Sequence, residues 1–167
     1  DADEWIDVQK QLVYWDLKLS KADESGMSDI LKSQKQEANN YFCKFIEQNY
    51  LDWLNNSNQD TPLMSHTLLK KKLIPELNQE SAFLIVLDCL RYDQWRILQP
   101  EFSKYFLIEQ DDCYFSILPT ATQFARNSLF AGLLPSEIQK RYPNLWVDEN
   151  EDERKNEHES DLLKALL

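Results

Sequence analysis

Asp88 occupies the position in the sequence that most strongly suggests chemistry. It directly follows a continuous apolar run, residues 82–87, with aliphatic, β-branched and aromatic members. Such a run is typical of a strand buried on both faces of a parallel sheet, although a buried helix can have the same composition. A carboxylate at the carboxyl end of such a strand lies where open α/β sheets bind their ligands. Asp88 is therefore a candidate site residue, with a helix cap as the alternative interpretation.

Both signs of charge follow Asp88 within five residues, because Arg91 and Asp93 come next in the sequence. Metal and phosphate chemistry needs both signs of charge at one place. Arg91 is thus a candidate substrate-binding residue. The alternative is an ordinary exposed arginine at the start of the next helix.

A second candidate group surrounds Thr122. A strand-like segment ends near Leu118, and the pattern predicts a helix from there to Gly132. Thr120 and Gln123 have the spacing of a capping box, which leaves the Thr122 hydroxyl uncommitted at the positive end of the helix. A phosphate would bind there, and a divalent cation held by the first group could activate the hydroxyl as a nucleophile.

Arg126 lies one turn beyond Thr122 and could pair with phosphate oxygens in fork geometry. Arg126 is therefore a second candidate substrate-binding residue. The alternative interpretation of the whole segment is a threonine-rich helix cap with a structural role only.

The composition limits the classes of function. With 167 residues, the chain is expected to hold one domain, or a helical module plus a partial domain. The formal net charge of −11 argues against duplex nucleic acid as a partner, and two glycines are too few for a Gly-rich phosphate loop. We expect a cytoplasmic protein without membrane insertion, since no long apolar segment or signal peptide is visible. Because the sequence begins with Asp1, we expect a fragment of a longer protein.

The first 60 residues are predicted to be a helical module. Apolar residues spaced by three and four from Trp5 to Leu19 predict one helix, and a longer one is predicted over residues 28–54. The two should pack antiparallel, and a polar stretch at residues 55–60 is the best internal boundary. No acid, base or ligand set accompanies these helices, so an interaction or signalling scaffold is the predicted role.

Residues 61–167 are predicted to be a partial α/β domain with a mainly parallel sheet. Strands are expected at residues 82–87, 104–108 and 113–117, with a helix at 92–98 that ends before Pro100. A helix between consecutive strands is typical of a parallel pair with a right-handed crossover. A short helix should start near Leu134, and a last one should cover residues 157–167.

Two of these stretches, LIVLDCLRYDQW and LPTATQFARNSLFAG, together resemble the opening half of a PglZ domain, a branch of the alkaline phosphatase superfamily. The resemblance implies a zinc-dependent phosphohydrolase of the phosphodiesterase type that works through a covalent phosphothreonine. It implies Asp88 as a metal ligand and Thr122 as the metal-bound nucleophile, with Thr120 as the fallback. It assigns no role to Arg91, Asp93 or Arg126.

With the stretch EANNYFCKFIEQNYLDWL included, the chain resembles the PorX family of response regulators in type IX secretion. That resemblance implies a receiver domain in cis and, as partners, a sensor kinase, a sigma factor or secretion motor proteins. A phosphorylated small molecule or oligonucleotide is the implied substrate, and a homodimer is a further possibility.

The superfamily completes a site for two zinc ions with further Asp and His residues, which this chain lacks. Its two histidines, His66 and His158, are not placed like those ligands. We therefore expect residues 1–167 to be inactive alone, and a non-enzymatic helical module for signalling and protein interaction is the alternative function.

Overall fold

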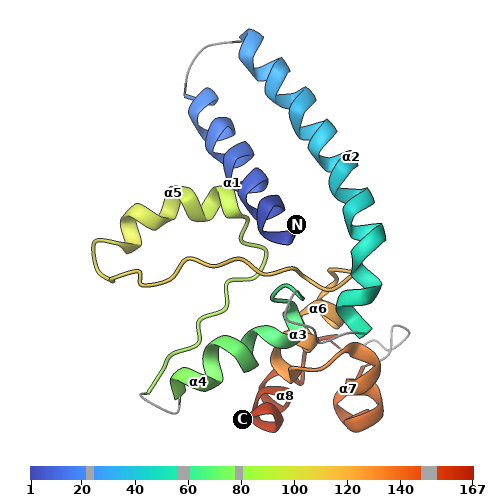
Figure 1. Ribbon diagram of the computed structural model, residues 1–167. Helices are drawn as coiled ribbons and strands as arrows, with labels where there is room; N and C mark the ends of the chain where they lie inside the picture. Colours follow the sequence, from blue (N-terminus) through green and yellow to red (C-terminus); the bar gives the residue numbers. More distant parts are fainter. Residues whose placement is uncertain (22–24, 56–60, 78–80, 148–153) are drawn as a thin grey trace. The chain divides into compact units, whose positions relative to one another are not determined.

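The computed structural model describes residues 1–21, 25–55, 61–77, 81–147 and 154–167. The chain divides into two compact units (Figure 1). The first comprises Asp1–Pro62 and Val86–Asp112, and the second comprises Leu63–Ile85 and Cys113–Leu167. Residues 56–60, where the domain boundary is predicted, lie outside the described ranges.

The predicted α/β fold is wrong for this chain. Helices account for 67% of the structure and strands for 1%. Among the described residues, β pairing is limited to one parallel bridge between Met64 and Phe115, and no sheet is present.

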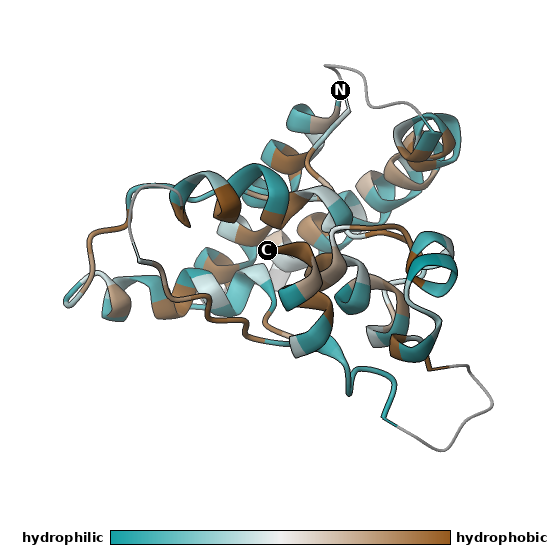
Figure 2. Cartoon of the chain, turned by 90° about the horizontal axis from the view of Figure 1, so that it is seen from below, coloured by the Kyte–Doolittle hydropathy of each residue, from teal (hydrophilic) through white to brown (hydrophobic). Residues whose placement is uncertain are grey.

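The predicted strand at residues 82–87 is an extended segment without a ladder partner. Its side chains are exposed, with 96% of Phe83 and 79% of Ile85 accessible to solvent. The predicted strand at residues 104–108 begins in a turn after a helix, and Leu107 is 85% exposed. Figure 2 shows apolar stretches along such extended connections as well as on the helices. A strand is stable only when a neighbour accepts its hydrogen bonds, and the described chain offers these runs none.

The first unit is built on two antiparallel helices, α1 (Ala2–Leu19) and α2 (Ser25–Asn55) (Figure 1). The Asp1 side chain caps α1 by accepting the N–H of Glu4 at 2.9 Å. Near the start of α1 the Trp5 ring packs against Phe42 and Phe45 of α2, with centroids 5.4 and 6.0 Å away. Both helices and their antiparallel packing are confirmed.

Helix α5 (Tyr92–Phe102) also belongs to the first unit and contacts α1. The prediction that it ends before Pro100 is wrong, because Pro100 lies inside its last turn. The proline lacks the N–H that would donate to the carbonyl four residues earlier, so the helix loses one hydrogen bond, yet Glu101 and Phe102 remain helical after it.

The second unit begins with three successive helical segments, α3 (Ser65–Leu68), the π-helix η1 (Leu69–Leu73) and α4 (Ile74–Leu77). The extended segment around Phe115 is attached to the start of α3. The N–H of Phe115 donates to Leu63 O at 2.8 Å, and the N–H of Ile117 donates to Ser65 Oγ at 3.1 Å.

Among its described residues, the second unit has four further helical segments: α6 (Thr122–Ala131), α7 (Pro135–Arg141), the 3-10 helix η2 (Pro143–Leu145) and α8 (Glu159–Leu166). They confirm the three helices predicted after Leu118, near Leu134 and at the end of the chain. Helix α6 lies at the centre, since it contacts α3, α7 and α8. The core is made of apolar side chains from η1, α6, α7, α8 and the loop after α6: Leu69, Leu129, Phe130, Ala131, Leu133, Ile138 and Leu162.

None of the described helices is both long enough and apolar enough to cross a bilayer.

Candidate functional site

Thr122 is the first residue of α6 and is half-buried. Ala121 precedes it in an extended conformation, and its carbonyl accepts the N–H groups of Phe124 and Ala125 at 3.0 and 2.9 Å. The N–H groups of a first helical turn have no intrahelical acceptor, and the helix dipole makes this end positive. The Thr122 hydroxyl therefore lies beside the end of α6 that favours an anion such as phosphate.

The predicted capping box between Thr120 and Gln123 is not formed. The N-cap of α6 is Ala121, which makes no side-chain cap hydrogen bond. Gln123 is instead buried, with 7% of its surface exposed, and its Nε2 donates to the carbonyl of Val147 at 2.6 Å. The Gln123 side chain thus donates to a distant carbonyl instead of accepting the backbone N–H of Thr120.

Arg126 lies one turn after Thr122 and forms an ion pair with Glu159 at the start of α8. Its Nη2 donates to Glu159 Oε2 at 2.7 Å, and its Nε lies 2.7 Å from Oε1. The two side chains are 24% and 16% exposed. Any phosphate bound by Arg126 would have to compete with this carboxylate.

Asp88 lies in an exposed turn of the first unit. Its Oδ1 accepts the N–H of Cys89 at 3.1 Å, and Cys89 has a positive φ of 57°. Asp88 thus follows an extended apolar run as predicted, but that run is not part of a sheet.

Arg91 and Asp93 neutralise each other at the start of α5. The Arg91 Nε and Nη2 atoms donate to Asp93 Oδ1 and Oδ2 at 3.0 and 2.9 Å. The hydrogen bond from Arg91 lowers the pKa of the Asp93 carboxyl, and the same bond raises the pKa of the Arg91 guanidinium. Arg91 remains 68% exposed, so a substrate phosphate would again have to replace a carboxylate.

The predicted site residues fall into two groups. Asp88 and Arg91 belong to the first unit, while Thr122 and Arg126 lie one turn apart on α6 of the second. Convergence of Asp88 and Thr122 on one metal ion stays a prediction.

The donor set for a metal ion is incomplete. Across the described ranges, no group of three or more His, Cys, Asp or Glu side chains is placed to hold one. Zinc sites in enzymes use three protein ligands, usually His, Cys or carboxylate. Asp88 and Thr122 supply one carboxylate and one hydroxyl, which does not amount to a zinc site.

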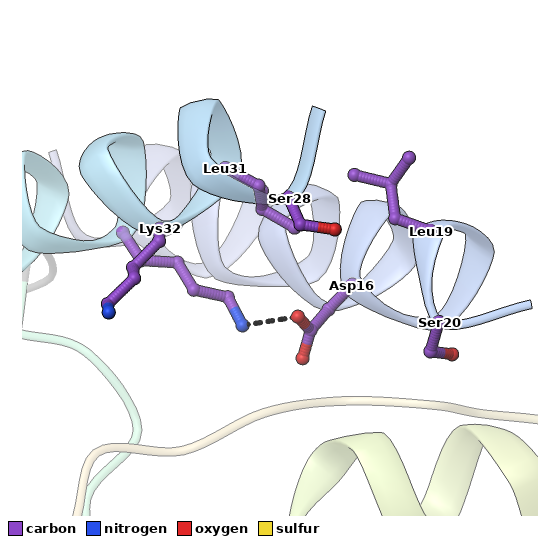
Figure 3. Close-up of a pocket in the computed structure, with 7 residues that line it drawn as sticks. Asp16, Leu19, Ser20, Ser28, Leu31 and Lys32 are labelled. Carbon is purple, nitrogen blue, oxygen red and sulfur yellow. Dashed lines mark ion pairs between the residues drawn. The ribbon is translucent and has the colours of Figure 1, made fainter. Parts of the chain in front are cut away.

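A pocket of about 370 Å³ lies in the first unit, between the end of α1 and the start of α2 (Figure 3). The Lys35 ammonium lies 2.7 Å from the Asp16 carboxylate at its wall. None of the predicted site residues lines this pocket, so it is not the candidate site.

The long-range polar contacts of three residues were not predicted from the sequence: Gln123, Asn127 and Glu159. The first two are four residues apart, which places two carboxamides on one face of a helix that packs in the core. That spacing is a visible signal of buried polar contacts. Their acceptors are backbone carbonyls far along the chain, which no sequence pattern marks.

Two families of known proteins match separate parts of the chain. Residues 68–167 match the family described as the BREX system PglZ alkaline phosphatase-like domain. The chain therefore belongs to the PglZ alkaline phosphatase-like family, and membership of that family suggests a metal-dependent domain. Residues 1–54 match the PorX response regulator linker domain. Both resemblances predicted from the sequence are confirmed, and no curated protein matches the chain.

Proposed function

We propose that the PglZ domain to which this chain contributes is a zinc-dependent phosphodiesterase with Thr122 as its nucleophile and Asp88 as one of its metal ligands. One observation carries the proposal: the family match includes α6, and Thr122 is the first residue of that helix, with its hydroxyl unused in capping. Backbone N–H groups and the helix dipole at that place favour a phosphate group.

In the proposed reaction, Thr122 Oγ1 forms a bond to phosphorus while the bond from phosphorus to the leaving alcohol breaks. The threonine proton is lost to base, and the leaving oxygen takes up a proton. Water then attacks the phosphothreonine, which restores the hydroxyl and releases the phosphomonoester. Arg126 is the proposed phosphate-binding cation, because its guanidinium is one turn away and already forms an ion pair with a carboxylate. Arg91 is a second candidate for the same role.

The proposal includes two zinc ions in the intact protein. Since the described residues supply only Asp88 and the Thr122 hydroxyl, residues 1–167 alone should bind zinc weakly and should not turn over. The proposed substrate is a phosphorylated small molecule or an oligonucleotide.

The test is hydrolysis of a chromogenic phosphodiester by the full-length gene product, with and without zinc chelation. Thr122→Val and Asp88→Asn should each abolish zinc-dependent hydrolysis, and Thr120→Val should leave it largely intact. Zinc-dependent hydrolysis that survives Thr122→Val would refute the nucleophile, and survival in Asp88→Asn would refute that metal ligand. Loss of activity in Thr120→Val alone would move the nucleophile to that residue.

A second candidate function is a non-enzymatic signalling module. It is favoured by the match of residues 1–54 to a response regulator linker, and by Tyr14 and Trp15 of α1, which are 53% and 51% exposed. Aromatic side chains are common anchors of protein interfaces. The proposed partners are a receiver domain in cis, a sensor kinase, a sigma factor, secretion motor proteins or a second copy.

The two functions predict different phenotypes for type IX secretion. If the helical module carries the signal, a chromosomal Thr122→Val change leaves secretion intact, while Tyr14→Ser with Trp15→Ser abolishes it. The opposite pattern would favour the enzymatic function.

A further inference from the structure

One face of α6 is fixed to the C-terminal part of the second unit through polar side chains. Gln123 and Asn127 are four residues apart on this face. The Gln123 Nε2 donates to Val147 O at 2.6 Å, and the Asn127 Nδ2 donates to Lys155 O at 2.9 Å. These two hydrogen bonds thus attach α6 to the chain before α8 at two residues, Val147 and Lys155.

Both carboxamides are buried, with 7% of Gln123 and 2% of Asn127 exposed. A buried amide that loses its partner keeps its desolvation cost, so each bond strongly favours one position of the helix relative to the segment it contacts. The two bonds differ in their place along α6. Asn127 lies in the middle of the helix, where backbone hydrogen bonds on both sides hold the chain.

Gln123 lies in the first turn, next to Thr122. The N-cap of α6 is Ala121, and it provides no side-chain hydrogen bond to this turn. First turns without a cap fray readily, because their N–H groups lack acceptors. The bond from Gln123 to Val147 is therefore the polar tether of the first turn, next to the contact of the Phe124 ring with Trp146, whose centroids are 6.0 Å apart.

We propose that Gln123 is a positioning residue for Thr122, and that its hydrogen bond to the Val147 carbonyl fixes the direction of the attacking hydroxyl. The inference rests on the proposed function, in which Thr122 is the nucleophile. Attack needs the reacting atoms at roughly 3–3.5 Å, and a displacement of about 1 Å can cost about 100-fold in rate. A first turn that frays would misplace the hydroxyl without removing the rest of the substrate site.

The experiment compares Gln123→Leu with Asn127→Leu in the full-length gene product, using a chromogenic phosphodiester. Both changes remove one buried carboxamide from the same helix and replace it with a side chain of similar size. For Gln123→Leu we expect kcat to fall by about 10- to 100-fold with KM within about twofold. For Asn127→Leu, at a comparable loss of Tm, we expect kcat to stay within about threefold of the wild type.

Amide hydrogen exchange provides a second measurement on the same proteins. Exchange of the amides at residues 122–125 should speed up in Gln123→Leu and not in Asn127→Leu. If Gln123→Leu does not fold, Gln123→Met keeps the length of the side chain and should show the same two effects.

Equal falls in kcat for the two positions at matched Tm, or a change confined to KM, would overturn the positioning role. The Thr122→Val control separates this outcome from failure of the proposed function. If Thr122→Val is inactive and Gln123→Leu is not, only the positioning role fails. If hydrolysis survives Thr122→Val, or the wild type shows none, both proposals fail.

Discussion

Gly132 ends α6 in the left-handed conformation, with a φ of +61°. Its N–H donates to Ser128 O at 2.9 Å, which closes the last turn of the helix, and its carbonyl accepts Lys70 Nζ at 2.5 Å. Glycine adopts this conformation at little cost because it has no Cβ.

Gly132→Ala should lower the free energy of unfolding by about 1–2 kcal/mol. A Cβ at this position would lie 2.8 Å from both Leu166 Cδ1 and Lys70 Cε, and the left-handed backbone adds its own strain. Urea denaturation measures the loss. Gly26→Ala is the matched control: no heavy atom lies within 4 Å of its added Cβ, and alanine favours helix over glycine, so stability should rise by about 0.5–1 kcal/mol. A loss of less than about 0.5 kcal/mol at Gly132 would show that the contact yields easily.

His66 is half-buried on α3. Its buried Nδ1 has no hydrogen-bond partner in the described part of the chain. Burial lowers the pKa of His66, as do the positive charges of Lys70 and Lys71 to a smaller extent, while Glu137 acts in the opposite direction.

The lowered pKa of His66 predicts acid sensitivity. Between the ordinary value of 6.5 and the lower folded pKa, the unfolded chain binds more protons at this site than the folded chain. The contribution of His66 to stability is therefore fully present above about pH 6.5 and is lost as the pH falls toward the folded pKa. His66→Gln should flatten the decrease of Tm between pH 7 and about pH 5 relative to the wild type. Parallel Tm profiles for the two proteins would contradict this.

At the scale of elements, the helices could be predicted from the sequence and the strands could not. The bonds of a helix are local, so the spacing of apolar residues in α1, α2 and α6 was enough to find them. The bonds of a strand need a partner elsewhere in the chain. Residues 82–87 have the composition of a buried strand, yet nothing in the described chain pairs with them or covers Phe83 and Ile85.

Of the candidate site, too, only the locally determined part could be predicted from the sequence. Thr122 was placed at a helix start by local signals, and α6 begins there. The partners of Gln123 and Arg126 were not predictable, because Val147 O and Glu159 are 24 and 33 residues away along the chain. Packing of α6 against α8 brings Glu159 to Arg126, whereas Val147 contacts Gln123 from the chain that follows η2.

The ion pair of Arg126 and Glu159 should stabilise the packing of α6 against α8. A double-mutant cycle with Arg126→Met and Glu159→Gln should give a coupling free energy of about 1–3 kcal/mol, because the pair is mostly buried and has two close contacts. Each single change should also destabilise, since it leaves one buried charge without its partner. Urea denaturation of the four proteins measures the coupling.

The pair of Lys164 and Asp161 within α8 provides the control. Its nitrogen and oxygen are 2.9 Å apart, but the side chains are 73% and 52% exposed. Solvent screens such a pair, so its cycle should give no measurable coupling. Similar coupling in both cycles would mean that burial does not strengthen the Arg126 pair.

At the scale of the whole molecule, the net charge of −11 opposes association, whereas the exposed apolar segments favour it. In the second unit Phe83 and Ile85 are 96% and 79% exposed, and in the first Tyr105 and Leu107 are 82% and 85% exposed. Charge repulsion acts over about 10 Å at 0.1 M salt and weakens as salt is added. Burial of apolar surface does not depend on this screening.

Residues 1–167 should therefore self-associate, increasingly so at higher salt, at concentrations of roughly 10–500 µM. Phe83→Asp with Ile85→Asp should shift light scattering toward the monomer, because it removes apolar surface from an extended segment open to pairing. Tm should hardly change, since neither side chain is buried. Ser81→Asp with Ser136→Asp adds the same two negative charges at exposed positions, and should reduce association much less. An equal reduction by both pairs would mean that charge alone controls association, and a monomeric wild type at high salt would show that the apolar segments are covered in solution.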